Sequence, residues 1–504
     1  MTKDYDVIVV GAGGSGLAAA LVAAERGGRV LILEKQPQPG GTTAIAIGSF
    51  TASKTRLQQA TGIEDDAQAH IEDAARFAPA EIESRNHAAL RSYFLAQAAE
   101  TLEWLESIGL SFVGPNPEPP NRVARMHNVV PGGRAYVVAL QVAAQRAGAT
   151  LLCDAATSSL IRDGQRVIGV TAQVSGRETE FRATRGVILA AGDYAGNPQL
   201  IAAHKGDKYQ HIEGINPQAS GDGHRLAGDA GARLMNMDVT YGPELRFVPS
   251  DKASLRRWLP TRGPVARLIG SLAPRVPQWV VRAMIKRMLV SWQHPESALF
   301  DDGAILVNGE GKRFVNEKQT PEREITVATQ PEKQAYLLLD GQLVARYSSW
   351  PNFISTAPDI AYAYINDYQR QRKDITTTGY TLEDVALRGG LDAAQLEETV
   401  RQFNEYIEGK SSDRFDRRDD TRPLHTDPWV LMGPLKAYFT TTEGGAAVNE
   451  KLQVLNDEDQ VIPGLYAVGQ NGLGGMILWG HGLHIAWAMT SGRLAGAAVM
   501  DAQP

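Results

Sequence analysis

The chain has 504 residues, of which 43% are hydrophobic and 21% charged, and its formal net charge is −6. Its length exceeds what one hydrophobic core usually holds, so two domains are expected, and the mild negative charge gives no reason to expect nucleic acid as a partner. Cys153 is the only cysteine, which excludes intrachain disulfides, cysteine-ligated iron–sulfur clusters and a haem attached through two cysteines.

Residues 6–35 have the pattern of a strand, a glycine turn, a helix and a second strand. The first apolar run ends at Gly11, Gly13 and Gly16 complete the spacing G-x-G-x-x-G, and the second apolar run ends at Glu34. The first glycine permits the tight turn, the second lets a pyrophosphate approach the backbone, and the third lets helix and strand pack closely. The helix start attracts the diphosphate, and the acid accepts the ribose hydroxyls. The pattern therefore predicts a dinucleotide-binding unit.

The loop that follows Glu34 favours FAD over NAD. Gly40 and Gly41 are followed by the hydroxyl side chains of Thr42 and Thr43. A glycine pair with hydroxyls, directly after the ribose acid, resembles the flavin-side loop of FAD proteins, whereas NAD dehydrogenases usually proceed to another strand at this point.

The rest of the chain alternates between helical and strand patterns at both ends but not in the middle. Apolar residues at helical spacing predict a helix over 87–110. The middle, 233–442, lacks the alternation and carries many Trp, Pro and Arg residues. Apolar runs predict strands over 149–157, 167–170, 179–181, 185–194 and 465–469, and the last helix is expected over about 483–501.

The order of the motifs resembles the flavoprotein family of fumarate reductases, succinate dehydrogenases and ketosteroid dehydrogenases, and most of all its ketosteroid 1-dehydrogenase-like branch. This resemblance implies an α/β fold in which a Rossmann-type FAD-binding domain, 1–236 and 443–504, carries an inserted α+β substrate-capping domain, 237–442. The matching segments are 11–16, 40–43, 132–134, 190–192, 221–223, 311–317, 442–445 and 463–469.

The fingerprint, the loop and the resemblance together give a set of cofactor-binding residues. No histidine lies between residues 40 and 51, where succinate dehydrogenases link FAD covalently, so we expect non-covalent FAD and no metal site. The expected cofactor residues are Gly11, Gly13, Gly14, Ser15, Gly16, Glu34, Lys35, Gly40, Gly41, Thr42, Thr43, Gly48, Ser49, Ala156, Ala191, Gly192, Asp222, Gly469, Gln470, Gly482 and Leu483.

The cations with which the fumarate reductases hold two carboxylates are absent from the matching positions. Pro321 stands where the resemblance places the proton-donor arginine, and Arg323 follows two residues later. Tyr241 and Thr440-Thr441 replace family histidines, and Trp479 replaces a carboxylate-binding arginine. Without those cations a dicarboxylate would be buried unpaired, at a cost of roughly several kcal/mol for each carboxylate. Fumarate and succinate are therefore disfavoured as substrates.

Candidates for the acid or base lie close to the C-terminal helix. Gly482 matches the family glycine whose backbone N–H binds a ketone, but Pro321 and Leu478 stand where the ketosteroid enzymes have tyrosines. His481 and His484 flank Gly482, and histidine titrates near neutral pH. The other candidates are Arg323, which either reaches the site or pairs with a carboxylate such as Glu322, and the tyrosines Tyr241 and Tyr136, for which ordinary packing is the alternative.

The leading hypothesis is desaturation of a small carbonyl compound, cyclic or otherwise apolar, between its α- and β-carbons, with a quinone or oxygen as external electron acceptor. An ene-reductase acting on an unsaturated acid or ketone, and a flavoprotein electron-transfer subunit, remain open alternatives. The start of the chain carries Asp4 and Asp6 in place of a signal peptide, so a cytoplasmic location is expected. A basic amphipathic stretch, 252–287, fits a solvated surface, a lid or a peripheral membrane contact.

Overall fold

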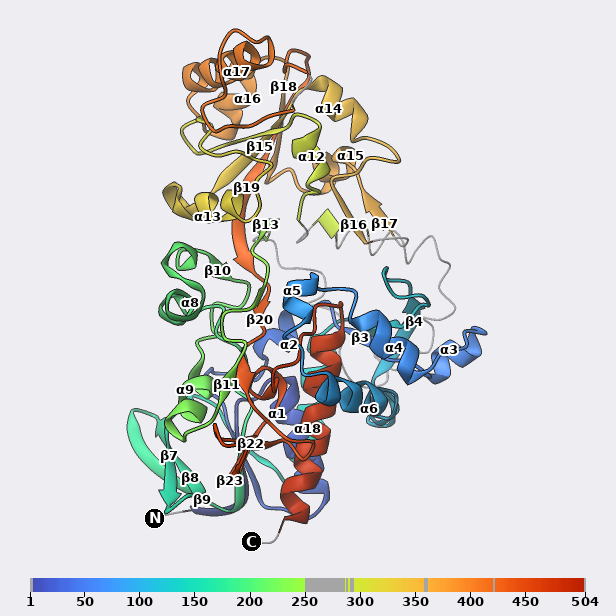
Figure 1. The fold of residues 1–504 in the computed structure, drawn as a ribbon, viewed down its shortest axis with the longest axis vertical. Helices are drawn as coiled ribbons and strands as arrows, with labels where there is room; N and C mark the ends of the chain where they lie inside the picture. The colour runs from blue at the N-terminus through green and yellow to red at the C-terminus, as the bar shows by residue number, and fades with distance from the viewer. Residues whose placement is uncertain are drawn as a thin grey trace.

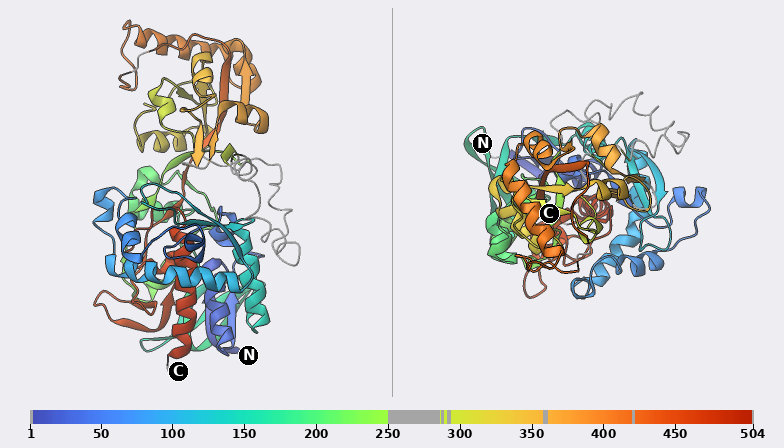
Figure 2. Two further views of the ribbon diagram at one scale, coloured as in Figure 1. Left: turned by 90° about the vertical axis from the view of Figure 1, so that its right-hand side faces the viewer. Right: turned by 90° about the horizontal axis from the view of Figure 1, so that it is seen from above.

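The computed structural model describes residues 3–249, 286, 289–290, 294–357, 361–419 and 422–502. It has two lobes stacked along the long axis, and both ends of the chain lie at the far end of the lower lobe (Figure 1, Figure 2). The stretch 252–287, for which three roles were open, lies outside the described residues except for Lys286. The Nζ of Lys286 is 2.8 Å from a carboxylate oxygen of Asp367. No helix in the described part of the chain has the length and hydropathy of a transmembrane segment.

The lower lobe is built on an eight-stranded sheet with the order β22-β23-β9-β1-β2-β6, in which β8 also pairs with β9 and β7 with β8. Strands β23, β9, β1, β2 and β6 are parallel. Parallel strands are covered on both faces and therefore appear as continuous apolar runs. The strands are β1 (Lys3–Val10), β2 (Val30–Leu33), β6 (Thr150–Leu152), β7 (Ala155–Asp163), β8 (Arg166–Val174), β9 (Arg177–Leu189), β22 (Gln453–Leu455) and β23 (Val461–Ala467).

Two strand predictions are wrong in their extent. The strands predicted separately over 179–181 and from 185 onward form one continuous strand, β9. The single strand expected over 149–157 is two strands, β6 and β7, because the chain turns at Asp154, whose φ is +53°. The backbone N–H of Asp154 donates to the carbonyl of Gln36 at 3.1 Å. Strand β6 continues the parallel sheet, whereas β7 leaves it to pair with β8.

Helices pack on this sheet through close backbone contacts. Helix α1 (Gly14–Glu25) lies against α18 (Leu483–Asp501), and a Cβ added to Gly492 of α18 would be 2.3 Å from the carbonyl oxygen of Ser15. The helix expected over 87–110 is confirmed as α6 (Ala88–Ser107). The other elements of the lobe are α2 (Gly41–Ile45), α3 (Arg56–Ala60), α4 (Ala67–Ala74), α5 (Ala80–Glu83), α7 (Arg134–Arg146), α8 (Pro198–Lys205), α9 (Asp222–Asp229), and the small sheet of β3 (Ser49–Thr51), β5 (Met126–Val130) and β4 (Ser111–Asn116).

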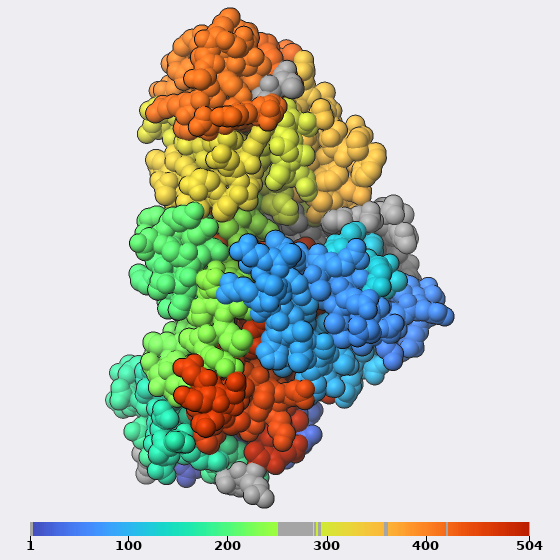
Figure 3. Space-filling model, viewed as in Figure 1, coloured from blue at the N-terminus to red at the C-terminus, as the bar shows by residue number. Residues whose placement is uncertain are grey.

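The upper lobe, yellow and orange in Figure 3, is organised around β19 (Trp429–Phe439), which pairs with four other strands. Its strands are β10 (Glu213–Gly214), β13 (Glu244–Phe247), β14 (Ile305–Val307), β15 (Ala335–Leu339), β16 (Ser355–Ala357), β17 (Ala361–Ala363) and β18 (Thr376–Gly379). Its helices are α12 (Ala298–Asp301), α13 (Glu322–Thr329), α14 (Gly341–Arg346), α15 (Ile365–Gln371), α16 (Leu382–Gly389) and α17 (Ala393–Ile407). The predicted mixed α/β fold is confirmed.

The two lobes are joined by chain segments that run side by side. Strand β11 (Leu234–Met235) pairs with β21 (Gly445–Ala446), and β12 (Thr240–Tyr241) pairs with β20 (Thr441–Thr442). Each lobe has its own apolar core, although Ile201 and Ile212 belong to the core of the upper lobe. The exact division at 236 and 442 therefore stays a prediction.

A buried ion network lies inside the upper lobe. A carboxylate oxygen of Glu317 is 2.9 Å from Arg313 and 2.8 Å from Arg417, and Glu317 and Arg417 are fully buried. Burial alone would raise the pKa of Glu317, but the two guanidinium groups outweigh it and lower that pKa to about 2. The arginine and glutamate of the 313–317 motif thus stabilise the lobe through each other.

Candidate active site

The turn between β1 and α1 has open space where a diphosphate is expected. A Cβ on Gly16 would be 2.0 Å from the carbonyl oxygen of Gly11, so the helix fits against the turn only without a side chain there. A Cβ on Gly13, by contrast, would meet no atom within 4 Å. The first turn of a helix has N–H groups without intrahelical acceptors, and these bind phosphate oxygens. The residues present therefore fit the pyrophosphate of a dinucleotide.

The acid at the end of β2 is buried and positioned by the backbone. The two carboxylate oxygens of Glu34 accept the N–H groups of Ala12 at 2.8 Å and Gln36 at 2.9 Å. A carboxylate has about four acceptor sites, so Glu34 keeps capacity for the ribose hydroxyls.

The flavin-side loop and the later motifs meet at the same turn. Thr43 accepts the N–H of Gly14 at 3.2 Å, and Thr42 accepts an amide hydrogen of Asn216 at 2.9 Å. The predicted cofactor residues in direct contact with one another or with this turn include Gly11, Gly13, Gly14, Ser15, Gly16, Glu34, Gly40, Gly41, Thr43 and Gly469. Gly48 and Ser49 lie at the start of β3 and Leu483 begins α18, while Ala156 lies on β7 and is exposed.

Lys35 and Asp222, both predicted to bind the cofactor, form an ion pair at 2.9 Å. Burial raises the pKa of Asp222, but the hydrogen bond and charge of Lys35 outweigh it, so that pKa is lowered. The carboxylate of Asp222 is therefore ionised at neutral pH and available to a ribose or ribityl hydroxyl.

Sequence reasoning missed Asn471, which ties two predicted segments together. Its side-chain oxygen accepts the N–H of Ala191 at 2.6 Å, and its amide nitrogen donates to the carbonyl of Gly192 at 2.8 Å. The neighbouring Gln470 donates to Thr441 at 2.6 Å. The only signal in the sequence was a second amide directly after Gln470.

A buried carboxyl group, Asp193, lies in the same network. It accepts the N–H of Ala195 at 2.8 Å and the hydroxyl of Thr441 at 3.0 Å. Burial raises the pKa of Asp193 to about 6, against these hydrogen bonds that lower it. Asp193 therefore changes its charge closer to neutral pH than an ordinary aspartate does.

His481 lies on the lower lobe, directly before α18, and is held at three points. Its backbone N–H donates to Oε1 of Glu118 at 2.8 Å, and its ring Nδ1 lies 2.6 Å from the same oxygen. Its carbonyl accepts the hydroxyl hydrogen of Thr51 at 2.6 Å. Gly482 follows with a φ of +84°, and a Cβ there would be 2.8 Å from the Thr51 hydroxyl.

The histidine on the other side of Gly482 has a carboxylate partner of its own. The ring Nε2 of His484 is 2.8 Å from Oε1 of Glu443, whose side chain is fully buried. The His484 side chain is 23% exposed, whereas that of His481 is 63% exposed. Of the two histidines, His481 is the accessible one.

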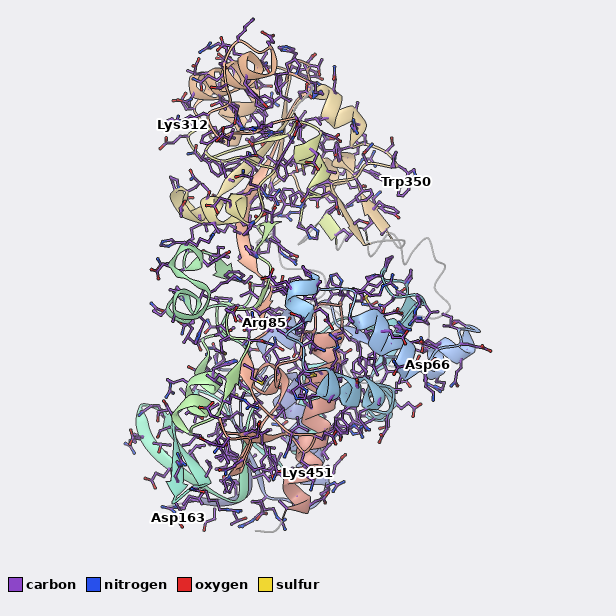
Figure 4. The ribbon with its side chains drawn as sticks, in the orientation of Figure 1. Asp66, Arg85, Asp163, Lys312, Trp350 and Lys451 are labelled. Carbon is purple, nitrogen blue, oxygen red and sulfur yellow. The ribbon has the colours of Figure 1, made fainter. Side chains whose placement is uncertain are left out.

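The upper lobe brings paired charges and aromatic rings toward His481. On β13, Arg246 donates to Glu244 at 2.8 Å. The charges of Glu244 and Arg246 act on the pKa values of both His481 and His294. Tyr241 packs edge to face on Trp479, with ring centroids 5.5 Å apart. Arg85, labelled in Figure 4, pairs with Asp238 near the same junction at 2.7 Å.

The pKa values of Tyr241 and His294 at this junction both shift in the direction that favours the neutral side chain. Burial, with the nearby Glu244, raises the pKa of the Tyr241 phenol well above its usual value. Burial lowers the pKa of His294 despite the nearby carboxylate. The Nδ1 of His294 has no hydrogen-bond partner among the described residues.

Arg323 is already engaged inside the upper lobe. It lies on α13, donates to Glu324 at 2.8 Å and to the carbonyl of Glu317 at 3.0 Å, and its guanidinium is 4.6 Å from the ring centre of Phe300. The sequence suggested Glu322 as the partner of Arg323. That prediction is wrong, because Glu322 is exposed and its carboxylate lies 3.8 Å from Lys208. A direct catalytic role for Arg323 stays a prediction.

A glycine turn at the edge of a parallel sheet, with an acid after the second strand, defines the class of α/β dinucleotide-binding proteins. The chain matches the family described as FAD binding domain over residues 6–479. It belongs to that family, and its cofactor is FAD.

Several known proteins are similar to nearly the whole chain. A probable fumarate reductase, Ifc3, of Shewanella frigidimarina is 27% identical over 98% of this chain and 74% of its own length. A vinyl phenol reductase of Lactiplantibacillus plantarum is 27% identical over 98% of this chain and 95% of its own. A 3-oxosteroid 1-dehydrogenase of Mycolicibacterium smegmatis is 24% identical over 98% and 96%.

The fold is also that of a solved flavoprotein. The open conformation of a flavocytochrome c3 fumarate reductase superposes with a TM-score of 0.73 at 24% identity, over 99% of this chain and 78% of that one. The protein is thus an FAD-dependent oxidoreductase acting on CH–CH or C=C bonds. Because reductases and a steroid dehydrogenase match it at similar identity, the ketosteroid branch is not favoured.

Proposed function

We propose that this oxidoreductase reduces a conjugated carbon–carbon double bond in an uncharged substrate and that His481 supplies the proton. Bound FAD supplies hydride chemistry to the β-carbon. The residues of the chain hold the cofactor, receive the substrate at the junction of the lobes and deliver the proton to the α-carbon.

The observation that carries the proposal is the charge balance at the junction. Arg246 is 2.8 Å from Glu244, and Arg323 is paired with Glu324. Among the residues that the structure describes, the guanidinium groups of Arg246 and Arg323 are therefore already matched by carboxylates. A substrate carboxylate would have to displace one of these pairs or remain unpaired, at a cost of roughly several kcal/mol. An uncharged substrate meets no such cost.

The other groups at the junction suit an apolar molecule with one polar atom. Trp479 and Tyr241 form an edge-to-face pair, which presents aromatic surface. The Tyr241 phenol keeps its proton because burial raises its pKa. It is thus a hydrogen-bond donor for a carbonyl or phenol oxygen of the substrate.

The raised pKa of His481 and the named relatives support reduction as the direction of the reaction. The surrounding protein atoms partly desolvate the ring and oppose a charge on it, but the hydrogen bond and charge of Glu118 outweigh this effect, so the pKa of His481 is raised. A raised pKa favours the protonated form of the histidine, which is the form that an acid in a reduction needs. The vinyl phenol reductase, 27% identical, is named for an uncharged alkene, which supports the same choice.

The electrons for such a reduction would come from an external donor. Cys153 is the only cysteine, so the chain itself holds no cysteine-ligated relay. A quinone or oxygen, expected from the sequence as an acceptor, is the corresponding partner if the reaction runs toward desaturation. That reverse reaction has the support of the 3-oxosteroid 1-dehydrogenase relative.

The test is anaerobic stopped-flow reoxidation of the reduced flavin by 4-vinylphenol, 2-cyclohexenone and fumarate. We expect reoxidation by a neutral alkene and little by fumarate. His481→Gln should slow it by about 10²- to 10⁴-fold, the usual contribution of a general acid. His425→Gln, at an exposed site in the upper lobe, is the matched control. Faster reoxidation by fumarate than by either neutral alkene would overturn the proposal.

A further inference from the structure

We propose that Glu118 is the positioning residue for His481, fixing its ring through Nδ1 so that Nε2 is the atom that exchanges the proton with the substrate. The inference rests on the proposed function of His481 and adds a residue to it. Glu118 lies between β4 and β5, 363 positions before its partner in the chain.

The geometry of the contact determines the orientation of the ring. A single oxygen, Oε1 of Glu118, is 2.8 Å from the backbone nitrogen of His481 and 2.6 Å from its Nδ1. Holding both atoms restricts the rotation of the side chain about its first bond. The hydroxyl of Thr51 holds the carbonyl of the same residue at 2.6 Å. The backbone and the ring are therefore both fixed, and Nε2 is the ring nitrogen that remains.

The two partners differ sharply in exposure. The side chain of Glu118 is 8% exposed, and that of His481 is 63% exposed. The second oxygen of Glu118, Oε2, is buried and has no hydrogen-bond partner within the part of the chain that the structure describes. A buried carboxylate without other donors depends on its one partner for compensation. Glu118 therefore favours a charged ring on His481.

Taken together, the other charges around His481 raise its pKa, as Glu118 does. Although the side chain of His481 is 63% exposed, the protein atoms around the ring remove part of its hydration, and this desolvation is the largest effect and lowers the pKa of His481. Glu118 and then Glu244 of β13 raise that pKa, and Arg246 of β13 opposes them. His294, which precedes α12, is itself subject to the charge of His481. The net result is a raised pKa.

The arrangement needs no movement between turnovers. The charged ring donates from Nδ1 to Glu118 and carries its second proton on Nε2. After Nε2 has given up that proton, the neutral ring still donates from Nδ1 to the same oxygen. The carboxylate thereby selects the tautomer in which Nε2 accepts the next proton.

In the pair of His484 and Glu443, the other ring nitrogen contacts the carboxylate. There the carboxylate of Glu443 is 2.8 Å from Nε2, and the histidine side chain is only 23% exposed. The bound nitrogen is thus the one that His481 leaves available. This difference singles out His481 for proton exchange.

The test is an NMR titration of the FAD-bound enzyme with ¹⁵N-labelled histidine rings, in which His481→Gln assigns the signals. In the wild type we expect a His481 pKa above the usual 6.5 and an Nδ1–H tautomer above that pKa. In Glu118→Gln the amide oxygen still accepts from Nδ1, so the tautomer should persist, but the pKa should fall by about one unit or more. Glu106→Gln, which removes a half-buried carboxylate paired with Arg56, should change neither.

An unchanged His481 pKa in Glu118→Gln would overturn the inference, even if that variant melted at a lower temperature, because that pattern means a structural role alone. Glu118→Asp keeps the charge but shortens the side chain. It should give an intermediate pKa, and it provides the readout if the glutamine variant does not fold.

The kinetic counterpart uses 2-cyclohexenone as the probe. In Glu118→Gln the loss of reoxidation rate at high pH should begin about one unit lower, which gives about a tenfold lower rate near pH 8. An enzyme whose reduced flavin no neutral alkene reoxidises would refute the proposed function. The NMR titration would still decide whether Glu118 controls His481, so the two failures are distinguishable.

Discussion

The pair Gly13→Ala and Gly16→Ala separates the binding of FAD from the packing of the fold. The backbone of Gly13 is extended, with φ −76° and ψ −176°, which alanine adopts without strain, and a Cβ there would meet no protein atom within 4 Å. At Gly16 the same methyl group would be 2.0 Å from the carbonyl oxygen of Gly11. One substitution therefore occupies only the space expected for the pyrophosphate, and the other collides with the protein itself.

The expected magnitudes differ accordingly. Gly13→Ala should leave the flavin-free protein as stable as the wild type, or more stable by up to about 1 kcal/mol, because alanine restricts the unfolded chain. Losing one hydrogen bond to a charged phosphate costs about 1.5–3 kcal/mol, so the Kd for FAD should rise about ten- to 150-fold. Gly16→Ala should destabilise the fold by about 3 kcal/mol, the upper end for overpacking against a rigid backbone.

The assay has two parts, thermal unfolding of the flavin-free proteins and calorimetric titration with FAD. If Gly13→Ala bound FAD with wild-type affinity, the pyrophosphate could not lie against this turn, and the assignment of the whole cofactor set would be wrong. If Gly16→Ala retained wild-type stability, the contact with Gly11 would not limit the packing of α1.

Three further predictions concern stability. Glu317→Gln should lower the stability of the upper lobe by about 3 kcal/mol at neutral pH. The difference in thermal unfolding between variant and wild type should shrink as the pH falls from about 4.5 toward 2, because the wild type then loses its own ion pairs. A difference that does not depend on pH would contradict this prediction. Asp193→Asn should make the flavin-free protein more stable than the wild type near pH 8 by up to about 3 kcal/mol. The reason is that a carboxyl group with a raised pKa stabilises the fold only while it is protonated, below that pKa. An equal gain in stability near pH 3 would show that ionisation of Asp193 is not the cause. Gly482→Ala should lower the free energy of unfolding by more than the roughly 1–2 kcal/mol of a left-handed backbone, because its Cβ meets Thr51. Gly109→Ala, with φ +98° and no atom within 4 Å of its Cβ, should lower it only by the backbone contribution. Equal losses of stability in the two variants would rule out the contact with Thr51.

The dinucleotide unit was predictable because its parts are close in sequence and because their roles depend on backbone conformation and backbone hydrogen bonds. Gly11, Gly13 and Gly16 act within one turn and one helix start, and Glu34 reaches Ala12 from the adjacent strand at 2.8 Å. Glycine spacing and an acid after an apolar run are therefore enough to specify the geometry.

Other details were decided by surroundings that the sequence does not display. The strand expected over 149–157 breaks because Asp154 takes a left-handed turn. Arg323 pairs with Glu324 and not with Glu322, since the ring of Phe300 and the carbonyl of Glu317 hold the guanidinium on the buried side of α13. Neighbouring acids look equivalent in a sequence until their burial is known.

The sequence by itself determined that this chain binds a dinucleotide with FAD-type loops, and it predicted that the positions matching the fumarate reductases do not hold a dicarboxylate. Only the tertiary structure decided which histidine has which carboxylate. Glu118 and His481 are 363 residues apart, and Glu118 acts on the ring because folding removes its carboxylate from water while leaving the imidazole accessible. The strength of an ionic contact depends on this difference in burial, which is a property of the packed molecule and not of residue order.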